Sequence, residues 1–283
     1  MNTLQTLTHI LIAPPLWLAL LFALVFAALS WQVRWLSRSG ALATAIVGFV
    51  ILGFGGGLFL IPLLTFFLSS SLLSRVGRAR KALARSRTAK GSVRDAGQVW
   101  ANGGVAFALV LLYAYVVRRW PVYETRLILM AYLAALATVN ADTWATEIGA
   151  LSRKAPRSLL DWRMVPAGTS GAVSGLGVLA SGLGAIVIPL VALPFWHLVR
   201  VEFVAVAWAG FLGSLLDSVL GAGVQAQYRD PATGELTDRP QAGRGQRERG
   251  LRWINNDMVN FLASVGGALC AWALLRFSGY MFL

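Results

Sequence analysis

The sequence predicts an all-α protein, a polytopic bundle of seven or eight transmembrane helices that forms one integral membrane domain over residues 1–283. Three observations support this fold class. The chain is 57% hydrophobic and only 13% charged, whereas a soluble domain carries about 25% charged residues. Apolar runs close to the length of a membrane span recur along the whole chain. The basic residues are concentrated in a few of the segments between these runs, as the positive-inside rule expects.

Eight apolar runs are candidates for membrane spans. We place them at about residues 11–30, 40–54, 57–73, 98–117, 126–142, 171–193, 203–221 and 256–275. The first run has no basic segment before it and no clear cleavage site, so we expect a retained helix and not a signal peptide. The second and third runs are short and meet at a glycine-rich turn. They could therefore also form one bent or re-entrant element, which would give seven spans.

The distribution of charge predicts the orientation of the spans. With eight spans, the loops that hold 20 of the 25 Lys and Arg residues all fall on one side, and these loops are at about 31–39, 74–97, 143–170 and 222–255. The other side keeps Arg118, Arg119, Arg126, Arg200 and Arg276. We therefore expect the basic loops to face the cytoplasm, in a bacterial inner (plasma) membrane. The net charge of +13 is then explained by an anionic leaflet, and no nucleic-acid partner is predicted.

The cysteine and histidine content excludes several kinds of site. Cys270 is the single cysteine of the chain, so no internal disulfide and no cysteine-based metal site can form. The two histidines, His9 and His197, are far apart at expected membrane edges. A histidine metal cluster and a Ser-His-Asp triad are therefore not predicted.

The stretch NADTWATEIG, which follows a long apolar run, carries two carboxylates, Asp142 and Glu147. Ionisable groups at membrane depth are costly and usually functional. On a continuous helix these two residues are about 140° apart. Asn140, Thr143 and Glu147 then share one face, and Asp142 lies on another. Either the helix end is distorted or only one carboxylate faces the site directly, and the structural alternative is that a carboxylate pairs with a loop arginine.

A glycine-rich stretch, VPAGTSGAVSGLG, comes directly before and into the sixth predicted span. Gly168 and Gly171 free the backbone there, and Thr169 and Ser170 lie between them. The start of a helix presents free N–H groups and the positive end of the helix dipole, which suits a phosphate. The structural alternative is that Thr169 or Ser170 only caps the helix.

A lone carboxylate, Asp217, interrupts the seventh predicted span. Gly210, Gly213 and Gly221 lie on the same helical face as Asp217, at successive spacings of three and four, where they could leave room for a ligand or a metal, or could serve close helix packing. Ser214, Ser218 and Gln225 continue this polar group.

The last predicted span opens with the sequence WINNDMVN. Asn256, Asp257 and Asn260 are spaced three and four residues apart, which favours one inward polar face, and helix capping is the structural alternative. Near the start of the fourth span, Arg94 and Asn102 are candidates for binding a phosphate or a nucleotide.

These polar stretches all lie on the predicted cytoplasmic side, which supports a single site. Its oxygen donors suit Mg²⁺, and we expect the metal ligands and catalytic residues to be Asp142, Glu147, Asp217 and Asp257. Mg²⁺ carboxylates, basic residues and a glycine-rich helix start are the parts that phosphoryl or nucleotidyl transfer needs. The membrane setting indicates a lipid phosphate as acceptor, with its tail between the spans. The expected substrate-binding residues are Arg94, Asn102, Asn140, Thr143, Gly168, Thr169, Ser170, Gly171, Ser214, Ser218, Gln225, Asn256 and Asn260.

Five stretches carry a resemblance to a known family, and they are QVWANGG (98–104), NADTWATEIG (140–149), VPAGTSGAVSGLG (165–177), GSLLDSVLGAGVQ (213–225) and WINNDMVN (253–260). In this order they resemble the integral-membrane family called domain of unknown function ninety-two. This family includes the plant phytyl-phosphate kinase and an animal transmembrane protein. It is distantly similar to polyprenol kinase and CDP-diacylglycerol synthase, a group that uses CTP and Mg²⁺. The resemblance implies a kinase that transfers a phosphoryl group from a nucleoside triphosphate to an isoprenyl (phytyl-like) monophosphate, giving the diphosphate.

Two other functions remain open from the sequence. A lipid-phosphate cytidylyltransferase would use the same metal site to make a CDP-lipid, and its release of pyrophosphate would distinguish it from a kinase. A transporter for a lipid or an anion would show polar residues at the membrane midplane and inverted repeats, and the sequence shows neither. The oligomeric state is also open, with a homodimer as one option.

Overall fold

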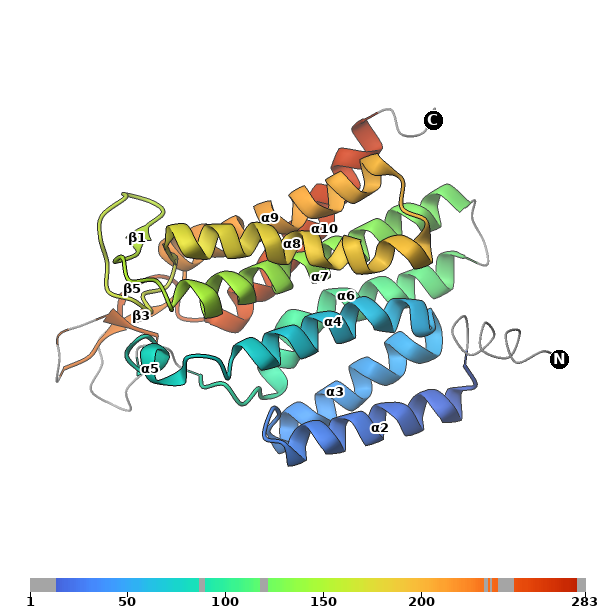
Figure 1. Ribbon diagram of the computed structural model, residues 1–283, viewed down its shortest axis with the longest axis horizontal. Coiled ribbons are helices and arrows are strands. Elements are labelled where there is room, and N and C mark those ends of the chain that lie inside the picture. Colours follow the sequence, from blue (N-terminus) through green and yellow to red (C-terminus); the bar gives the residue numbers. More distant parts are fainter. Residues whose placement is uncertain are drawn as a thin grey trace.

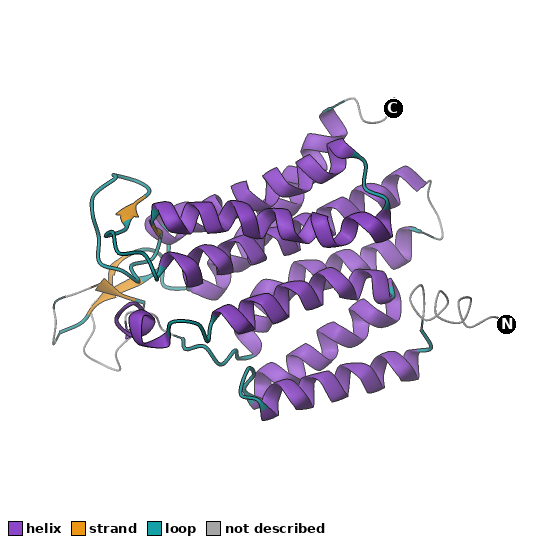
Figure 2. Cartoon of the chain, in the orientation of Figure 1, coloured by secondary structure: helices purple, strands orange, loops and turns teal. Residues whose placement is uncertain are grey.

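The computed structural model describes residues 14–86, 90–117, 122–231, 234, 236–238 and 247–278, which form a bundle of long helices with short strands at one end (Figures 1 and 2). Residues 11–13 of the first predicted span, His9, Arg118 and Arg119 lie outside the described residues. The elements in chain order are α2 (Leu16–Gln32), α3 (Arg38–Val50), the π-helix η1 (Ile51–Gly55), α4 (Gly57–Leu73), α5 (Arg78–Ser86), α6 (Ala96–Val116), α7 (Val122–Gly149), β1 (Arg157–Ser158), β2 (Ala172–Val173), α8 (Gly175–Trp196), α9 (Arg200–Gly223), β3 (Gln227–Arg229), β4 (Leu236–Thr237), β5 (Arg247–Arg249) and α10 (Asn256–Phe277).

The predicted fold class is confirmed. The described part of the chain contains six helices that are long and apolar enough to cross a membrane, namely α3 with η1, α6, α7, α8, α9 and α10. Two shorter apolar helices, α2 and α4, occupy the positions of the first and third predicted spans. The second and third runs are separate helices because the chain reverses at Gly56, which has a φ of +83°. The two runs therefore form two helices and not one continuous bent helix.

Successive long helices run in opposite directions, so the longer connections gather at one end of the bundle (Figure 1). We call this the loop end, and it carries the segments at 33–37, 74–95, 150–174 and 224–255. Two small antiparallel sheets stand there, one pairing β1 with β2 and the other in the order β4-β3-β5. The described part of the chain begins with α2 and ends with α10 toward the opposite end.

Each long helix that begins at the loop end has a side chain that caps its N-terminus. Ser37 accepts a hydrogen bond from Gly40 N at the start of α3, and Asp95 accepts one from Gln98 N at the start of α6. Ser174 and Asn255 do the same for α8 and α10. Such caps satisfy N–H groups that the helix leaves free. The positive ends of four helix dipoles are thereby brought to the loop end.

Helix α7 is the central element of the bundle. In its most apolar stretch 78% of the residues are buried, against 33–44% in the other five long helices, and it contacts α4, α6, α8, α9 and α10. A helix that is buried on all sides must be apolar on all sides, and the run Leu127–Ala137 contains no charged residue. The charged residues of α7 therefore lie outside this run, toward the two ends of the helix.

Glycines on the neighbouring helices allow them to approach α7 closely. A Cβ atom at Gly210 or Gly213 of α9 would overlap Ala137 or Thr138 of α7. Gly184 of α8 lies equally close to the α7 backbone. The glycines beside Asp217 are therefore explained by helix packing, and the interpretation that they leave room for a ligand or a metal was wrong for these two positions.

At the end opposite to the loop end, a buried ion pair joins α7 to α9. Arg126 donates from Nε to Glu202 Oε1 at 2.6 Å and from Nη2 to Oε2 at 2.7 Å. Glu202 is fully buried, and its carboxylate also accepts from Val199 N at 2.9 Å. Bidentate arginine–carboxylate pairs fix both distance and orientation. The pair therefore fixes the position of α9 along α7. This position also determines how the residues at the loop end of these two helices lie relative to each other.

We predict that Gly213→Ala lowers the thermal unfolding temperature of the purified protein in detergent, because the new methyl group overlaps Thr138 and overpacking costs about 1–3 kcal/mol. Gly182→Ala is the matched control, since a Cβ there meets no atom within 4 Å and alanine favours a helix over glycine by about 1 kcal/mol. Gly182→Ala should leave the unfolding temperature unchanged or raise it. Equal losses in both variants would contradict the packing described here.

Candidate active site

A polar cavity of about 600 Å³ opens at the loop end, between the ends of α6, α7, α9 and α10 and the segments at 150–174 and 224–255. A space of this size matches the ordinary range of small-molecule sites. The charged residues that line it are Lys81, Lys90, Arg94, Asp142, Glu147, Lys154, Asp217, Asp238, Arg252 and Asp257. Five carboxylates and five cations thus face one space.

Two carboxyl groups meet in this cavity, on neighbouring helices. Asp142 of α7 and Asp217 of α9 lie within hydrogen-bonding contact of each other. Within the described ranges, no Lys or Arg forms an ion pair with either group. Two carboxylates at this distance repel each other unless they share a proton or a cation lies between them. The pair therefore holds either a shared proton or a bound cation.

An asparagine of α10 completes this group. With its side-chain amide turned so that the nitrogen faces the carboxylate, Asn260 donates to Asp217 Oδ2 at 2.9 Å and to Asn256 O at 3.2 Å. Asn102 of α6 lies 3.3 Å from Asn260. Four helices, α6, α7, α9 and α10, thus contribute to one polar cluster, as the spacing of these residues predicted.

Glu147 is neutralised by a buried lysine. Lys81 of α5 is 1% exposed, and its ammonium lies 2.6 Å from Glu147 Oε2. The same ammonium donates to Leu73 O, at the end of α4, at 2.8 Å. A buried cation and a buried carboxylate at this distance stabilise each other. The expected alternative for a helix-end carboxylate, pairing with a basic loop residue, is the one observed, with lysine in place of arginine.

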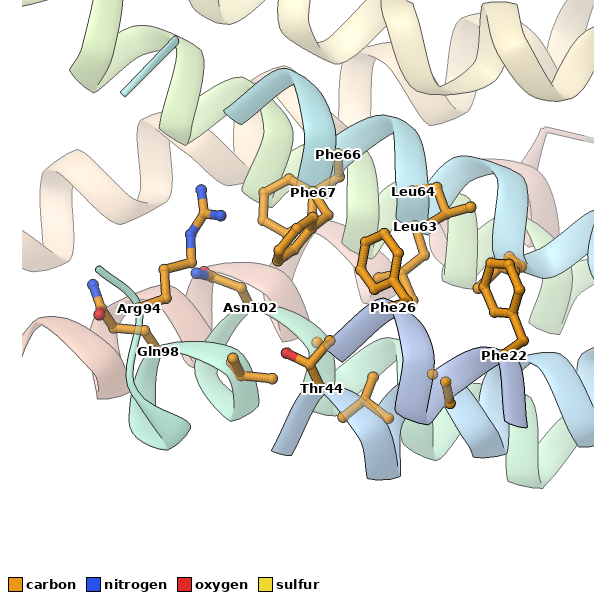
Figure 3. A pocket seen from close by; sticks show the side chains of 16 residues that line it. Phe22, Phe26, Thr44, Leu63, Leu64, Phe66, Phe67, Arg94, Gln98 and Asn102 are labelled. Atoms are coloured by element: carbon orange, nitrogen blue, oxygen red, sulfur yellow. The ribbon is translucent and has the colours of Figure 1, made fainter. Parts of the chain in front are cut away.

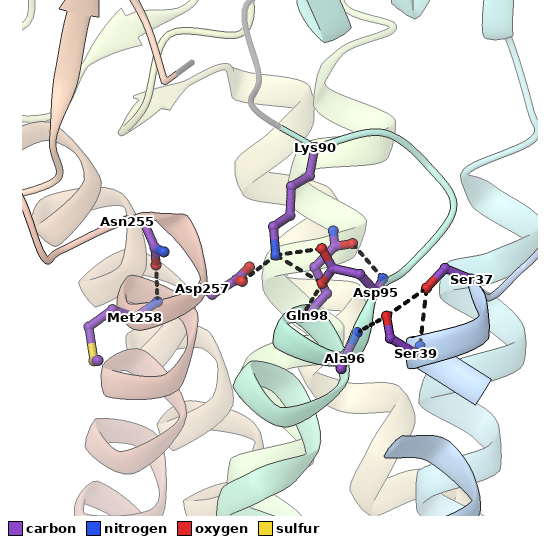
Figure 4. A network of polar contacts seen from close by, with 10 residues as sticks. Ser37, Ser39, Lys90, Asp95, Ala96, Gln98, Asn255, Asp257 and Met258 are labelled. Atoms are coloured by element: carbon purple, nitrogen blue, oxygen red, sulfur yellow. Dashed lines mark hydrogen bonds and ion pairs between the residues drawn. The ribbon is translucent and has the colours of Figure 1, made fainter. Parts of the chain in front are cut away.

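Asp257 is also held by a lysine, at the wall between α6 and α10 (Figure 4). Lys90 donates to Asp257 Oδ2 and, at 2.9 Å, to Asp95 Oδ1. Burial lowers the pKa of Lys90, but the hydrogen bonds to Asp257 and Asp95 outweigh it and leave the pKa raised. Asp257 Oδ1 is buried and forms no hydrogen bond among the described atoms. Lys90 therefore connects the start of α6 to the start of α10. Asp257 Oδ1 remains able to accept a further hydrogen bond.

The four predicted metal ligands do not form one cluster. Among the described residues there is no group of three or more His, Cys, Asp or Glu that could hold a metal ion. The reason is that α7 stays helical to Gly149, so Asp142 and Glu147 point to different sides. Asp142 meets Asp217, whereas Glu147 and Asp257 are each bound to a lysine. Of the predicted set, only the pair on α7 and α9 is arranged to share a cation.

The glycine-rich stretch forms a loop along the cavity and not the start of a helix. Gly168 and Gly171 have φ values of +89° and +73°, which glycine adopts readily. Helix α8 begins at Gly175 with Ser174 as its cap, so the predicted start at 171 and the predicted capping role of Thr169 or Ser170 were wrong. A Cβ at Gly171 would overlap Ser218 O and Ala222 of α9. The loop therefore lies directly on the end of α9, close to Asp217.

The hydroxyls of this loop donate to the protein. Thr169 Oγ1 donates to Pro166 O at 2.8 Å, and Ser170 Oγ donates to Asp238 Oδ1 at 2.8 Å. Gln225 Nε2 donates in turn to Ser170 Oγ at 2.8 Å. Burial raises the pKa of Asp238 to about 6, and the hydrogen bonds from Ser170 and Gln225 oppose this shift. Asp238 is thus mostly ionised at neutral pH, and neither hydroxyl is free to donate to a phosphate in this conformation.

The cavity brings together all but one of the residues that the sequence singled out. Those that line it are Arg94, Asn102, Asp142, Thr143, Glu147, Gly168, Thr169, Ser170, Gly171, Ser214, Asp217, Ser218, Gln225, Asn256, Asp257 and Asn260. Asn140 does not line it. Its side chain is fully buried, donates to Gly184 O at 2.7 Å and accepts from Ser69 Oγ at 3.0 Å. These bonds join α7 to α8 and α4, which is a structural role.

Sequence reasoning missed the lysines. Lys81, Lys90 and Lys154 are the three lysines of the chain, and all three line the cavity. Their positions in basic loops suggested only positive-inside charge. The signal that could have found them is their rarity, because the other 22 basic residues are arginines. Asp238 and Arg252 were missed as well, since both lie in a loop without any helical pattern.

The comparison with known families decides the classification. The profile of the family described as integral membrane protein DUF92 matches residues 21–268. The chain belongs to this family. No solved structure matches the chain.

Among curated proteins, the DUF92 chain resembles an uncharacterized membrane protein of Methanocaldococcus jannaschii at 28% identity, covering 95% of both chains. It is 29% identical to Protein PGR of Arabidopsis thaliana, over 86% of this chain and 92% of that protein. Protein VTE6, chloroplastic, of the same plant is 24% identical over 54% of this chain and 40% of its own length.

We predict that Lys81→Met destabilises the protein by up to about 3–5 kcal/mol, because it removes the buried cation that lies against the Glu147 carboxylate. Adding Glu147→Gln to this variant should restore most of the loss. Denaturant unfolding of the purified protein in detergent measures both effects. Lys154→Met is the control, since it removes a cavity lysine whose side chain is exposed. A Lys81→Met variant as stable as the Lys154→Met variant would show that the pair contributes nothing to stability.

Proposed function

We propose that this DUF92 protein is a membrane-embedded, Mg²⁺-dependent kinase that transfers a phosphoryl group from a nucleoside triphosphate, with CTP as the expected donor, to an isoprenyl (phytyl-like) monophosphate. The observation that supports it most is the Asp142–Asp217 pair in a cavity whose other walls carry lysines and arginines. The resemblance of the sequence motifs to a family that includes the plant phytyl-phosphate kinase points the same way.

The residues present fit a magnesium ion. Mg²⁺ is usually bound by one or two carboxylates together with substrate phosphates and water. Asp142 and Asp217 supply two carboxylates in contact, and the hydroxyl of Ser214, which also lines the cavity, offers a further oxygen ligand. When bound, the ion would neutralise charge on the phosphates of the donor. Glu147 and Asp257 would hold Lys81 and Lys90 in place through their ion pairs and would not bind the metal ion.

The cations of the cavity suit the negative charge of a triphosphate. Lys154 and Arg252 line the cavity, and no ion pair with a carboxylate is seen for either of them in the part of the chain that the structure describes. The N-termini of α6, α8 and α10 point their dipoles toward the same end of the bundle. Since the loop hydroxyls of Thr169 and Ser170 are already engaged, we assign phosphate binding mainly to these cations and helix ends.

The chemistry that follows needs little from the protein beyond positioning. An oxygen of the acceptor phosphate attacks the γ-phosphorus of the donor, the bond from that phosphorus to the bridging oxygen breaks, and the nucleoside diphosphate leaves with the electron pair. The acceptor oxygen is already ionised at neutral pH, so no strong base is required. Arg94 and Arg252 would neutralise charge that develops during transfer, and most of the rate enhancement would come from orientation and electrostatics.

The distribution of charge supports an orientation in which this cavity faces the cytoplasm. The cavity lies at the loop end, and the loop end carries most of the basic residues of the chain. Basic loops remain on the cytoplasmic side of a bacterial inner membrane. A donor nucleotide would then reach the site directly from the cytoplasm, while the lipid acceptor would reach it from the bilayer.

We predict that protein purified in detergent with Mg²⁺ converts phytyl or geranylgeranyl monophosphate into the diphosphate, and that CTP gives more turnover than UTP, ATP or GTP. Resolving both the nucleotide and the lipid products is the measurement. A nucleoside diphosphate identifies the kinase. A CDP-lipid with pyrophosphate would instead identify a cytidylyltransferase, and no turnover by folded protein with any pair would contradict both.

The same assay tests the metal assignment. Asp217→Asn should lower kcat by about 100-fold or more, since loss of one metal ligand removes both affinity and charge stabilisation. Asp161→Asn is the matched control, because Asp161 lies exposed in the 150–174 segment and does not line the cavity. An Asp217→Asn variant with normal Mg²⁺-dependent turnover would rule out this carboxylate as a ligand.

A further inference from the structure

A narrow apolar groove runs along the bundle between α2, α3, α4 and α6 (Figure 3). Its walls are formed by leucine, valine, alanine and phenylalanine side chains, with Phe22 and Phe26 from α2 and Leu63, Leu64 and Phe67 from α4. Figure 3 shows Phe22 at one end of the groove and Arg94 at the other. The groove is therefore elongated, apolar over most of its length and charged at a single end.

Aromatic rings follow the groove as a continuous row. The rings of Phe22 and Phe26 have centroids 6.2 Å apart, and those of Phe26 and Phe67 are 5.2 Å apart. The Arg94 guanidinium carbon lies 5.4 Å from the Phe67 ring. From Leu60 to Phe67, α4 alone provides about 10 Å of this wall, at 1.5 Å per residue. Such a row offers an apolar chain a surface that leads directly to a cation.

The charged end of the groove is shared with the polar cavity. Arg94, Gln98 and Asn102 line both spaces, and Asn102 lies 3.3 Å from Asn260, which contacts Asp217. A lipid phosphate placed at this junction would thus have its headgroup at the cavity and its tail along the groove.

Arg94 is suited to hold an anion at the junction. Its guanidinium donates to Ser71 Oγ at 2.7 Å and to Ser70 Oγ at 2.8 Å. Within the described residues it forms no ion pair with a carboxylate. Burial lowers the pKa of Arg94 to about 10, and the charge of Glu147 opposes this shift, so the side chain stays charged at neutral pH. A buried cation that only hydroxyls solvate gains strongly from a phosphate.

We infer that the groove between α2, α3, α4 and α6 binds the hydrocarbon tail of the acceptor, a single-chain isoprenyl monophosphate, with its phosphate at Arg94. This assignment rests on the proposed kinase function for the identity of the headgroup. The enclosed space is only about 50 Å³, so it takes only a short part of one thin chain. The outer surface of α2 exposes large apolar residues to the membrane, so the rest of the tail can stay in contact with lipid.

Leu64→Trp tests the groove, because the larger side chain fills it. The KM for phytyl monophosphate should rise by about tenfold, which corresponds to the loss of about 1.4 kcal/mol of tail contacts, while the KM for the nucleotide stays unchanged. Leu68→Trp is the matched control, since Leu68 lies one turn further on α4, is exposed and does not line the groove. Equal KM values for the lipid in the two variants would overturn the inference. Unfolding temperatures of both variants verify that each is folded.

A second measurement does not depend on turnover. Phytyl monophosphate with a photoactivatable diazirine in the tail should crosslink to peptides that contain Phe22–Phe26 or Leu60–Phe67. Crosslinks to these peptides without any kinase activity would support tail binding in the groove and would contradict the proposed reaction. Normal kinase activity with crosslinks confined to α8, α9 or α10 would support the proposed reaction and would contradict tail binding in the groove.

Discussion

The close packing of α7 against its neighbours is the constraint on which the rest of the structure depends. A helix that is buried on every side can be approached only by helices with small residues at the crossing points, and Gly210 and Gly213 of α9 provide this. The Arg126–Glu202 pair fixes the same two helices at the opposite end. Because α9 can lie so near to α7, the carboxyl groups of Asp142 and Asp217 are forced into contact at the loop end.

Basic residues balance most of the carboxylates at the loop end. Five carboxylates face one space, and lysines bind Glu147 and Asp257, whereas the α7–α9 pair has no Lys or Arg partner among the described residues. In the proposed function, the cavity combines one position for a metal with cations for phosphates. The apolar groove at its side, which ends at Arg94, adds a place for a lipid tail. A polar headgroup site and an apolar tail site then meet at the level where the membrane surface would lie.

Much of this architecture could be predicted from the sequence, for physical reasons that differ between elements. Apolar runs predict the helices because few kinds of backbone structure can span a membrane. Polar residues at the ends of these runs predict which side chains line the cavity at the loop end. Partners across helices could not be predicted, since Lys81 meets Glu147 and Lys90 meets Asp257 only after the bundle has packed. Asn140 looked like part of the site because it is polar and neighbours Asp142, but the carbonyl of Gly184 satisfies it inside the bundle. The loop at Gly168–Gly171 looked like a helix start because its glycines and hydroxyls precede an apolar run, but the actual capping residue, Ser174, follows a few positions later.

The most direct test of the central claim, that the packing of α7 on α9 creates a divalent-metal site for a nucleotide, is the binding of Mn²⁺ followed by electron paramagnetic resonance. Titration of the purified protein with Mn²⁺ in the presence of a nonhydrolysable CTP analogue should show a protein-bound ion. Asp142→Asn and Asp217→Asn should each weaken this binding by about 10- to 100-fold, whereas Glu147→Gln should leave it close to that of the wild type. Wild-type Mn²⁺ affinity in both aspartate variants would contradict the account.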